Sequence, residues 1–323
     1  MFRRVIVTLL ASLLAAVPFT AGAAGTPIKI GVLAFGTLNW EIAVIKDEGL
    51  DKAHGFSLET FPLASPEAGK IGLQGGSLDL AVGDWIWVAK QREQGIDFSF
   101  VPYSSSHGAL VVPKDSPIRG LADLKGKRLG IAGGGLDKNW LLLRALAQKQ
   151  EGLDLDKAVE KTFGAPPLLN EELQQGKLDA VLNYWNYAAK LVAKGYRQIV
   201  DGRGILRGLG IEAEVPALGY VFREAYGKAH GAELAGFFKA AAEAKQRICA
   251  SDAVWAKVAP LTQEADAAVG EALRKQYCAG RVADFGEAGR KAAGEVYALI
   301  GTTAGGKAAA LPAGVFWPSA ATQ

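Results

Sequence analysis

The sequence predicts an α/β protein made of two similar lobes, each a mostly parallel sheet flanked by helices. First, two segments that begin at Leu73 and Leu173 share Leu, Gln, Gly, Leu, Asp and Trp at matched positions. Second, short apolar runs alternate with segments of helical length, which is typical of βαβ units and a parallel sheet. Third, a chain of 323 residues is long enough for two domains.

Each copy of the repeated segment predicts a helix end, a short strand and a turn into the next helix. Gly76 and Gly176 supply the left-handed conformation that ends many helices. The apolar run that follows suits a strand covered on both faces. Because ligands of open α/β sheets bind beyond the carboxyl ends of strands, residues 83–85 and 183–185 are expected to face a cleft. The alternative is that the Trp in each turn belongs to the core.

Apolar periodicity and turn residues give the elements of the first half in order. Ser65 and Pro66 have the residue types of a helix cap and first helical position. The loop 34–39 precedes a helix whose free amides could bind an anion, and a plain turn capped by Asn39 is the alternative. Strands are expected over 28–33, 56–61, 98–103 and 109–112, and helices over 40–50, from 66, and over 85–94.

The second half begins with the proline-containing segment 112–117, which marks a domain boundary. A glycine run, 133–135, separates a strand from a helix and lets a ligand approach the backbone; a flexible connector is the alternative. The expected strands are 128–132, 159–163, 198–200 and 216–222, and the expected helices are 140–148, 166–175 and 188–194. From Ala225 the chain is Ala-rich and helical, and 311–323 are expected to be loose. Lobe 1 is therefore expected to combine 24–111 with 216–323, and lobe 2 to comprise 112–215.

Residues 1–23 have the pattern of a secretory signal, cleaved near Ala23. Arg3 and Arg4 form the charged start, and the apolar stretch 5–17 is too short for a comfortable membrane span. The alternative is an uncleaved anchor. We therefore expect a periplasmic protein.

An exported chain meets an oxidising compartment, so its two cysteines, Cys249 and Cys278, are expected to form a disulfide rather than two buried free thiols. The formal net charge is +3 without a basic block, which argues against nucleic acid as a partner. The chain has no G-x-S-x-G, H-E-x-x-H or nucleophile–base motif. We therefore expect no enzymatic activity, no catalytic residues, no cofactor and no dedicated metal site.

Specific segments give the chain a family resemblance. The V-P-K-D-S-P run within 110–118 and the D-L-K-G-K run within 121–127, taken with Gly31, the glycine run and both repeat copies, resemble the periplasmic solute-binding proteins for sulfonates, taurine and nitrate. Thiamine-pyrimidine-binding proteins are similar. The resemblance covers 28–196 well and the helical tail loosely.

The resemblance implies the type II periplasmic-binding-protein fold, with two hinge strands between the lobes. It also implies a monomeric, periplasmic substrate-binding component of an ABC importer. Such a component captures a small organic ligand in the cleft and delivers it to a permease and ATPase in the inner membrane.

The family's ligand-contacting loops match segments 36–40, 83–85, 107–109, 134–139 and 183–185. The candidate ligand-binding residues are Thr37, Asn39, Trp40, Asp84, Trp85, His107, Gly134, Gly135, Asp137, Asn139, Asn183, Tyr184 and Trp185. The Asp84 carboxylate would repel a sulfonate, and the aromatic residues could stack on a flat or cationic ligand. The hypothesis is an aromatic, heterocyclic or amine-bearing ligand, for example a thiamine-precursor pyrimidine. A chelated metal held by Asp84 and Asp137 is an alternative.

Two other functions compete with transport. The first is an enzyme, because a related fold serves a pyrimidine synthase of thiamine biosynthesis. That family has a cysteine-rich motif and is intracellular, whereas both cysteines here lie in the helical tail. The other is a periplasmic accessory protein that binds a protein partner and transports no ligand. A cleft filled by bulky side chains would favour the accessory role, and an open aromatic-lined cleft would favour transport.

Overall fold

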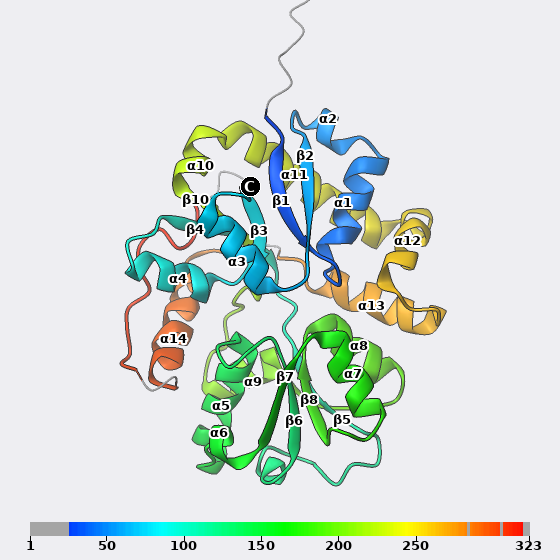
Figure 1. The fold of residues 1–323 in the computed structure, drawn as a ribbon, viewed down its shortest axis with the longest axis vertical. Helices are drawn as coiled ribbons and strands as arrows, with labels where there is room; N and C mark the ends of the chain where they lie inside the picture. Colours follow the sequence, from blue (N-terminus) through cyan, green and yellow to red (C-terminus); the bar gives the residue numbers. More distant parts are fainter. Residues whose placement is uncertain (1–25, 283–284, 304–305, 319–323) are drawn as a thin grey trace, which may run out of the picture.

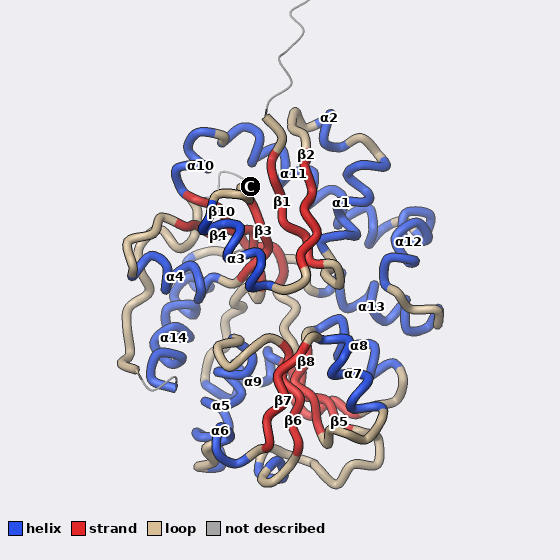
Figure 2. The backbone as a smooth tube through the Cα atoms, viewed as in Figure 1, coloured by secondary structure: helices blue, strands red, loops and turns tan. Residues whose placement is uncertain are grey.

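A computed structural model describes residues 26–282, 285–303 and 306–318, and shows two five-stranded sheets, each flanked by helices (Figures 1 and 2). We call the first sheet with its helices lobe 1 and the second lobe 2. The predicted signal segment, 1–23, lies outside the described residues.

The two sheets have the same strand arrangement. Lobe 1 has the order β2-β1-β3-β10-β4, and lobe 2 has the order β7-β6-β8-β5-β9. In each sheet the fourth strand is antiparallel to both neighbours, and it is the first strand after the chain crosses from the other lobe. The strands are β1 Ile28–Leu33, β2 Leu58–Leu63, β3 Leu80–Gly83, β4 Phe98–Ser104, β5 Ala109–Val112, β6 Arg128–Ala132, β7 Glu160–Gly164, β8 Ala180–Asn183, β9 Arg197–Asp201 and β10 Leu218–Arg223. Sheet pairing in lobe 2 thus starts at Ala109.

The repeated segments occupy equivalent places in the two lobes and include β3 and β8. The Asp79 carboxylate accepts from the backbone N–H of Lys29 at 2.9 Å, and the Asp79 N–H donates to the Lys29 carbonyl at 2.9 Å. Asp179 makes the same pair of hydrogen bonds, also at 2.9 Å, with Arg128 at the start of β6. The repeat is therefore a structural device that fixes the start of the central parallel strand pair in each lobe.

Each helix predicted from 66 and over 85–94, 140–148, 166–175 and 188–194 has a counterpart in the structure. The Ser65 hydroxyl accepts from the Ala68 N–H and Pro66 opens α3, which confirms the predicted cap. The single helix predicted over 40–50 is instead divided, because Gly49 adopts a φ of 66° between α1 and α2. The α-helices are α1 Leu38–Asp47, α2 Leu50–Ala53, α3 Pro66–Gly75, α4 Trp85–Glu93, α5 Lys138–Glu151, α6 Leu155–Ala158, α7 Pro166–Gln174, α8 Trp185–Ala193, α9 Gly202–Leu209, α10 Glu224–Ala229, α11 Gly231–Ala250, α12 Asp252–Val258, α13 Ala267–Ala279 and α14 Glu287–Thr303.

The helical tail contacts both lobes. Helix α13 packs against α8, and α14 packs beside α5, so both helices reach lobe 2 (Figure 1). The expectation that 311–323 are loose is wrong for Val315 to Trp317. The Phe100 N–H donates to the Val315 carbonyl, and the Trp317 N–H donates to the Phe100 carbonyl. Backbone hydrogen bonds to the free edge of β4 therefore hold this segment.

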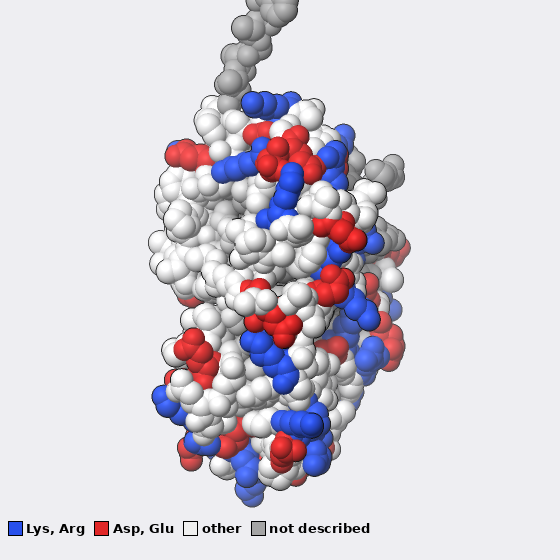
Figure 3. Space-filling view, turned by 90° about the vertical axis from the view of Figure 1, so that its right-hand side faces the viewer, with Lys and Arg blue, Asp and Glu red and all other residues white. Residues whose placement is uncertain are grey.

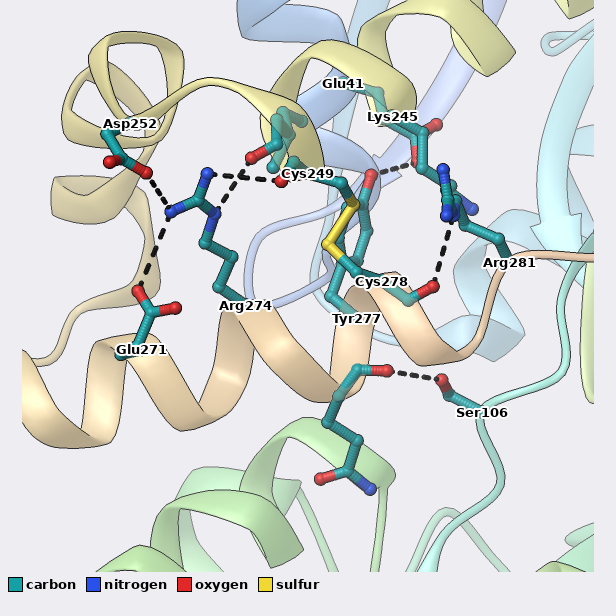
Figure 4. Close-up of a disulfide and its surroundings, with 12 residues drawn as sticks. Glu41, Ser106, Lys245, Cys249, Asp252, Glu271, Arg274, Tyr277, Cys278 and Arg281 are labelled. Atoms are coloured by element: carbon teal, nitrogen blue, oxygen red, sulfur yellow. Dashed lines mark hydrogen bonds and ion pairs between the residues drawn. A yellow bond between two sulfur atoms is a disulfide. The ribbon is translucent and has the colours of Figure 1, made fainter.

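Cys249 on α11 and Cys278 on α13 form a disulfide with their Cα atoms 5.7 Å apart, which confirms the predicted pairing (Figure 4).

Across the described part of the chain, none of the helices combines the length and apolar character that a membrane span requires.

Candidate ligand-binding cleft

A cavity of about 190 Å³ lies between the lobes, at the carboxyl ends of β1, β3 and β6. Figure 3 shows that the molecule narrows between its upper and lower halves. Lobe 1 contributes the loop after β1, α3 and the turn after β3. Lobe 2 contributes the loop after β6 and the turn after β8. Both copies of the repeated segment therefore reach the same cavity.

Eight of the thirteen candidate residues line this cavity, and they come from both lobes. They are Thr37, Asp84, His107, Gly134, Asp137, Asn139, Tyr184 and Trp185. The other five, which are absent from its wall, are Asn39, Trp40, Trp85, Gly135 and Asn183.

Two of the five are core aromatics. Trp85 is fully buried, its indole N–H donates to the Pro216 carbonyl at 3.0 Å, and its ring packs against Phe316. Trp40 is also buried, and its ring lies against Trp255 and Tyr277. The alternative interpretation of the repeat, a core Trp, therefore describes Trp85, whereas Trp185 reaches the cavity wall.

Asn39 and Asn183 shape the loops instead of facing the cavity. The Asn39 amide donates to the carbonyls of Leu33 and Gly36, while Thr37 takes the cap position of α1. The Asn183 amide donates to the Pro166 carbonyl at 2.9 Å, and its side-chain oxygen accepts from the Tyr184 N–H at 2.8 Å. Asn183 thereby fixes the turn that presents Tyr184.

Asp84 and Asp137 cap two of the helices that begin at the cavity, α4 and α5. One Asp84 oxygen accepts from the Trp87 N–H at 2.9 Å at the start of α4. One Asp137 oxygen accepts from the Asn139 N–H at 2.8 Å at the start of α5. Asp is a favoured cap because its carboxylate satisfies a free amide and complements the helix dipole. Both carboxylates also line the cavity, so capping and ligand contact are compatible roles.

The pKa of Asp137 is raised to about 6, mainly by burial and in part by the charge of the Asp84 carboxylate across the cleft. Hydrogen bonds from the Asn139 backbone and the positive charge of Lys138 act in the opposite direction. Burial also raises the pKa of Tyr184, with further contributions from Asp137 and Glu67. The cleft is therefore an acidic environment in which an additional negative charge is unfavourable.

Sequence reasoning missed Lys138, which is buried in the cavity wall beside these acids. Its ammonium donates to the Ala217 carbonyl in the crossing that leads to β10, and burial lowers its pKa. The sequence signal that could have found it is its position: Lys138 directly follows the helix cap that comes after the glycine run. Further lining residues that were not predicted are Phe35, Glu67, Lys70, Trp87, Tyr103, Ser106 and Asn186.

His107 connects the two crossings between the lobes. Its Nε2–H donates to the Val215 carbonyl at 3.1 Å, whereas Nδ1 has no hydrogen-bond partner among the described residues. The pKa of His107 is lowered to about 3, mainly by burial and in part by the positive charge of Lys138. The imidazole is therefore neutral in the folded protein.

We predict that His107 makes the protein less stable in mild acid. Below its ordinary pKa of 6.5 the unfolded chain binds a proton at this residue, and the folded protein does so only near pH 3. The free energy of unfolding should thus fall by about 1 kcal/mol more in the wild type than in His107→Gln between pH 6 and pH 5. Urea unfolding at the two pH values measures this difference; parallel pH dependences in both proteins would contradict it.

The described residues contain no group of three His, Cys, Asp or Glu side chains arranged to hold a metal ion. Asp84 and Asp137 alone are two carboxylates, whereas a Ca²⁺ site uses about six to eight oxygen ligands.

A protein-family model described as NMT1/THI5 like matches residues 41–252. Over 132 residues the chain is 33% identical to a candidate aliphatic sulfonates-binding protein of Escherichia coli (strain K12), an alignment that spans 39% of this chain and only 40% of that protein's length.

Two solved structures share the fold. The alkanesulfonate-binding protein SsuA from Xanthomonas axonopodis pv. citri, bound to MOPS, superposes with a TM-score of 0.70 at 18% identity, over 90% of this chain and 98% of that chain. The periplasmic aliphatic sulphonate binding protein SsuA from Escherichia coli gives 0.60 at 22% identity, over 77% and 83%. These likenesses confirm the predicted type II periplasmic-binding-protein fold.

Proposed function

The chain belongs to the NMT1/THI5-like family, and we propose on this basis that it is the periplasmic substrate-binding component of an ABC importer. It captures a small organic ligand in the cleft between its lobes and delivers it to a permease and ATPase in the inner membrane. The family is one of non-enzymatic substrate-binding proteins, which confirms the prediction that the chain is not an enzyme.

The observation that carries this proposal is the cavity shared by both lobes. Ligand sites are typically concave and largely apolar, with a few polar groups that fix orientation. Here the aromatic side chains of Phe35, Trp87, Tyr184 and Trp185 line the cavity together with a small set of charged residues. A ligand held by both lobes stabilises their closure, which is how a binding protein signals occupancy to a partner. An aromatic-lined cleft favours transport over the accessory role.

A thermal-shift panel on the exported protein tests the proposal, with sulfonates, taurine, nitrate, aromatic acids, amines and thiamine precursors as probes. A ligand at a hundred times its dissociation constant should stabilise the folded state by about 2.7 kcal/mol, which gives a clear rise in melting temperature. The protein is first partly unfolded and dialysed so that any retained ligand is removed. If every probe leaves the melting temperature unchanged and native mass spectrometry finds no copurified molecule, the transport proposal fails and the accessory role gains support.

A further inference from the structure

Two carboxylates, one from each lobe, line the same cavity, and each has one oxygen atom that is not used in a helix cap. Asp84 and Asp137 each use Oδ1 to cap a helix, and their Oδ2 atoms accept no hydrogen bond from the described residues. They are close enough for the charge of Asp84 to act on Asp137. Without a ligand between them, their repulsion opposes the approach of the lobes.

The charges around the cavity leave this pair without full compensation. Three carboxylates and two ammonium groups line the cavity, so its wall carries one net negative charge when all of them are ionised; they are Glu67, Asp84, Asp137, Lys70 and Lys138. Lys70 pairs with Glu67 at 3.8 Å on α3. Lys138 donates to a backbone carbonyl and lies within ion-pair distance of neither Asp84 nor Asp137. One positive charge from a ligand would balance the wall.

The same geometry disfavours an anion. The first turns of α4 and α5 point toward the cavity, and free amides at such helix ends attract anions. Here the side chains of Asp84 and Asp137 already occupy these amides and add negative charge in front of them. A sulfonate or carboxylate would meet two carboxylates in a poorly hydrated site, which is costly.

Polar and aromatic groups beside the pair suit a planar cation. A Cβ atom added at Gly133 would lie 3.0 Å from the Tyr184 hydroxyl and 3.1 Å from Asp137 Oδ2, so these two oxygens flank one point on the glycine loop. The Tyr184 hydroxyl has no hydrogen-bond partner among the described residues. Trp87, Tyr184 and Trp185 line the cavity, and the faces of aromatic rings attract cations.

We propose that the cleft binds a small planar organic monocation, such as an amidine or a protonated nitrogen heterocycle, whose N–H groups bridge Asp84 of lobe 1 and Asp137 of lobe 2. This inference rests on the proposed solute-binding function and names the chemical class of its ligand. The cation relieves the repulsion between the two carboxylates, so binding and lobe closure stabilise each other.

The test uses three probes of one shape and different charge: benzamidine, benzamide and benzoate. Calorimetry and thermal shift at pH 8 should show binding of benzamidine and a clearly weaker or absent response to the other two. Asp84→Asn and Asp137→Asn should each weaken benzamidine binding by roughly tenfold to a hundredfold. Both variants should fold, because Asn is as good a helix cap as Asp. The matched control is Asp201→Asn, which removes a capping carboxylate from α9 away from the cavity and should leave the affinity unchanged.

The affinity for benzamidine should also fall as the pH drops through about 6, where Asp137 takes up a proton. The charged groups that act on Asp137 are Asp84 and Lys138. The Tyr184 hydroxyl lies beside it, and Glu67 on α3 acts on Tyr184. The Asp137→Asn variant should lose this pH dependence.

The possible results separate the two proposals. Benzoate or benzamide binding as tightly as benzamidine would overturn the monocation while leaving solute binding intact. If benzamidine gives no shift while an anionic or neutral solute of the wider panel does, the monocation is overturned in the same way. If no solute of any class binds, the proposed function itself fails.

Discussion

Removal of the Cys249–Cys278 disulfide in a Cys249→Ala/Cys278→Ala variant is expected to lower the free energy of unfolding by about 3.5 kcal/mol. The disulfide closes a loop with a sequence separation of 29 residues, and loop closure restricts the unfolded chain more than the folded one. Urea unfolding of the oxidised wild type and the variant measures the difference. Dithiothreitol should destabilise the wild type by a similar amount and leave the variant unchanged.

The contacts around the disulfide show which helices lose stability when it is removed. The Arg274 guanidinium on α13 donates to the carbonyls of Ile248 and Cys249 and forms an ion pair with Asp252, so it also ties α13 to α11 and α12 (Figure 4). Helix α13 packs against α8 of lobe 2, so the disulfide supports a contact between the lobes. If the variant lost less than about 1 kcal/mol, the disulfide would add little to the native contacts of Arg274, and the loop-entropy argument would be wrong.

Local signals made much of the fold predictable. The repeated Gly, Leu and Asp positions predicted equivalent strands in the two lobes, because a cap residue and a short apolar run act over a few residues. The same is true of Ser65 and Pro66 at the start of α3. The split after Asp47 was harder to predict, since helix periodicity continues across Gly49 and only its positive φ ends α1.

The candidate site was less predictable, because it depends on what packs against each turn. Trp85 and Trp185 have the same place in the repeat, yet only Trp185 lines the cavity. The C-terminal segment places Phe316 against Trp85, and the Pro216 carbonyl accepts from its indole N–H. Both partners are distant in sequence, so no local pattern could distinguish the two tryptophans.

Polar residues inside the core were also not predictable from the sequence. Glu41 follows the predicted cavity loop and gives no sequence signal beyond an acidic residue in the first turn of a helix. In the structure its carboxylate is fully buried and accepts from the hydroxyls of Tyr220 and Tyr277. Lys245 lies 3.3 Å from it and donates to the Tyr103 carbonyl at 2.7 Å. Three distant segments converge on one charge, and only tertiary structure reveals it.

Glu41→Ala is expected to lower the free energy of unfolding by about 3–5 kcal/mol, among the largest effects of any single substitution in this chain. The substitution leaves the buried Lys245 ammonium without its counter-charge and deprives two tyrosine hydroxyls of their acceptor. Burial lowers the pKa of Lys245, and Glu41 opposes that shift, so Lys245 should become easier to deprotonate in the variant. Denaturant unfolding measures the loss, and it should diminish at high pH as the uncompensated ammonium loses its proton.

A double-mutant cycle separates the charge from the packing. If the cost of Glu41→Ala comes mainly from the unpaired ammonium, then Glu41→Ala/Lys245→Met should be more stable than Glu41→Ala alone, because a buried pair can be replaced by apolar groups at low cost. Glu41→Gln is the matched control: its amide oxygen can still accept from Tyr220 or Tyr277, so only the charge is lost. Equal stability of Glu41→Gln and the wild type would show that the tyrosine hydrogen bonds, rather than the ion pair with Lys245, make Glu41 important.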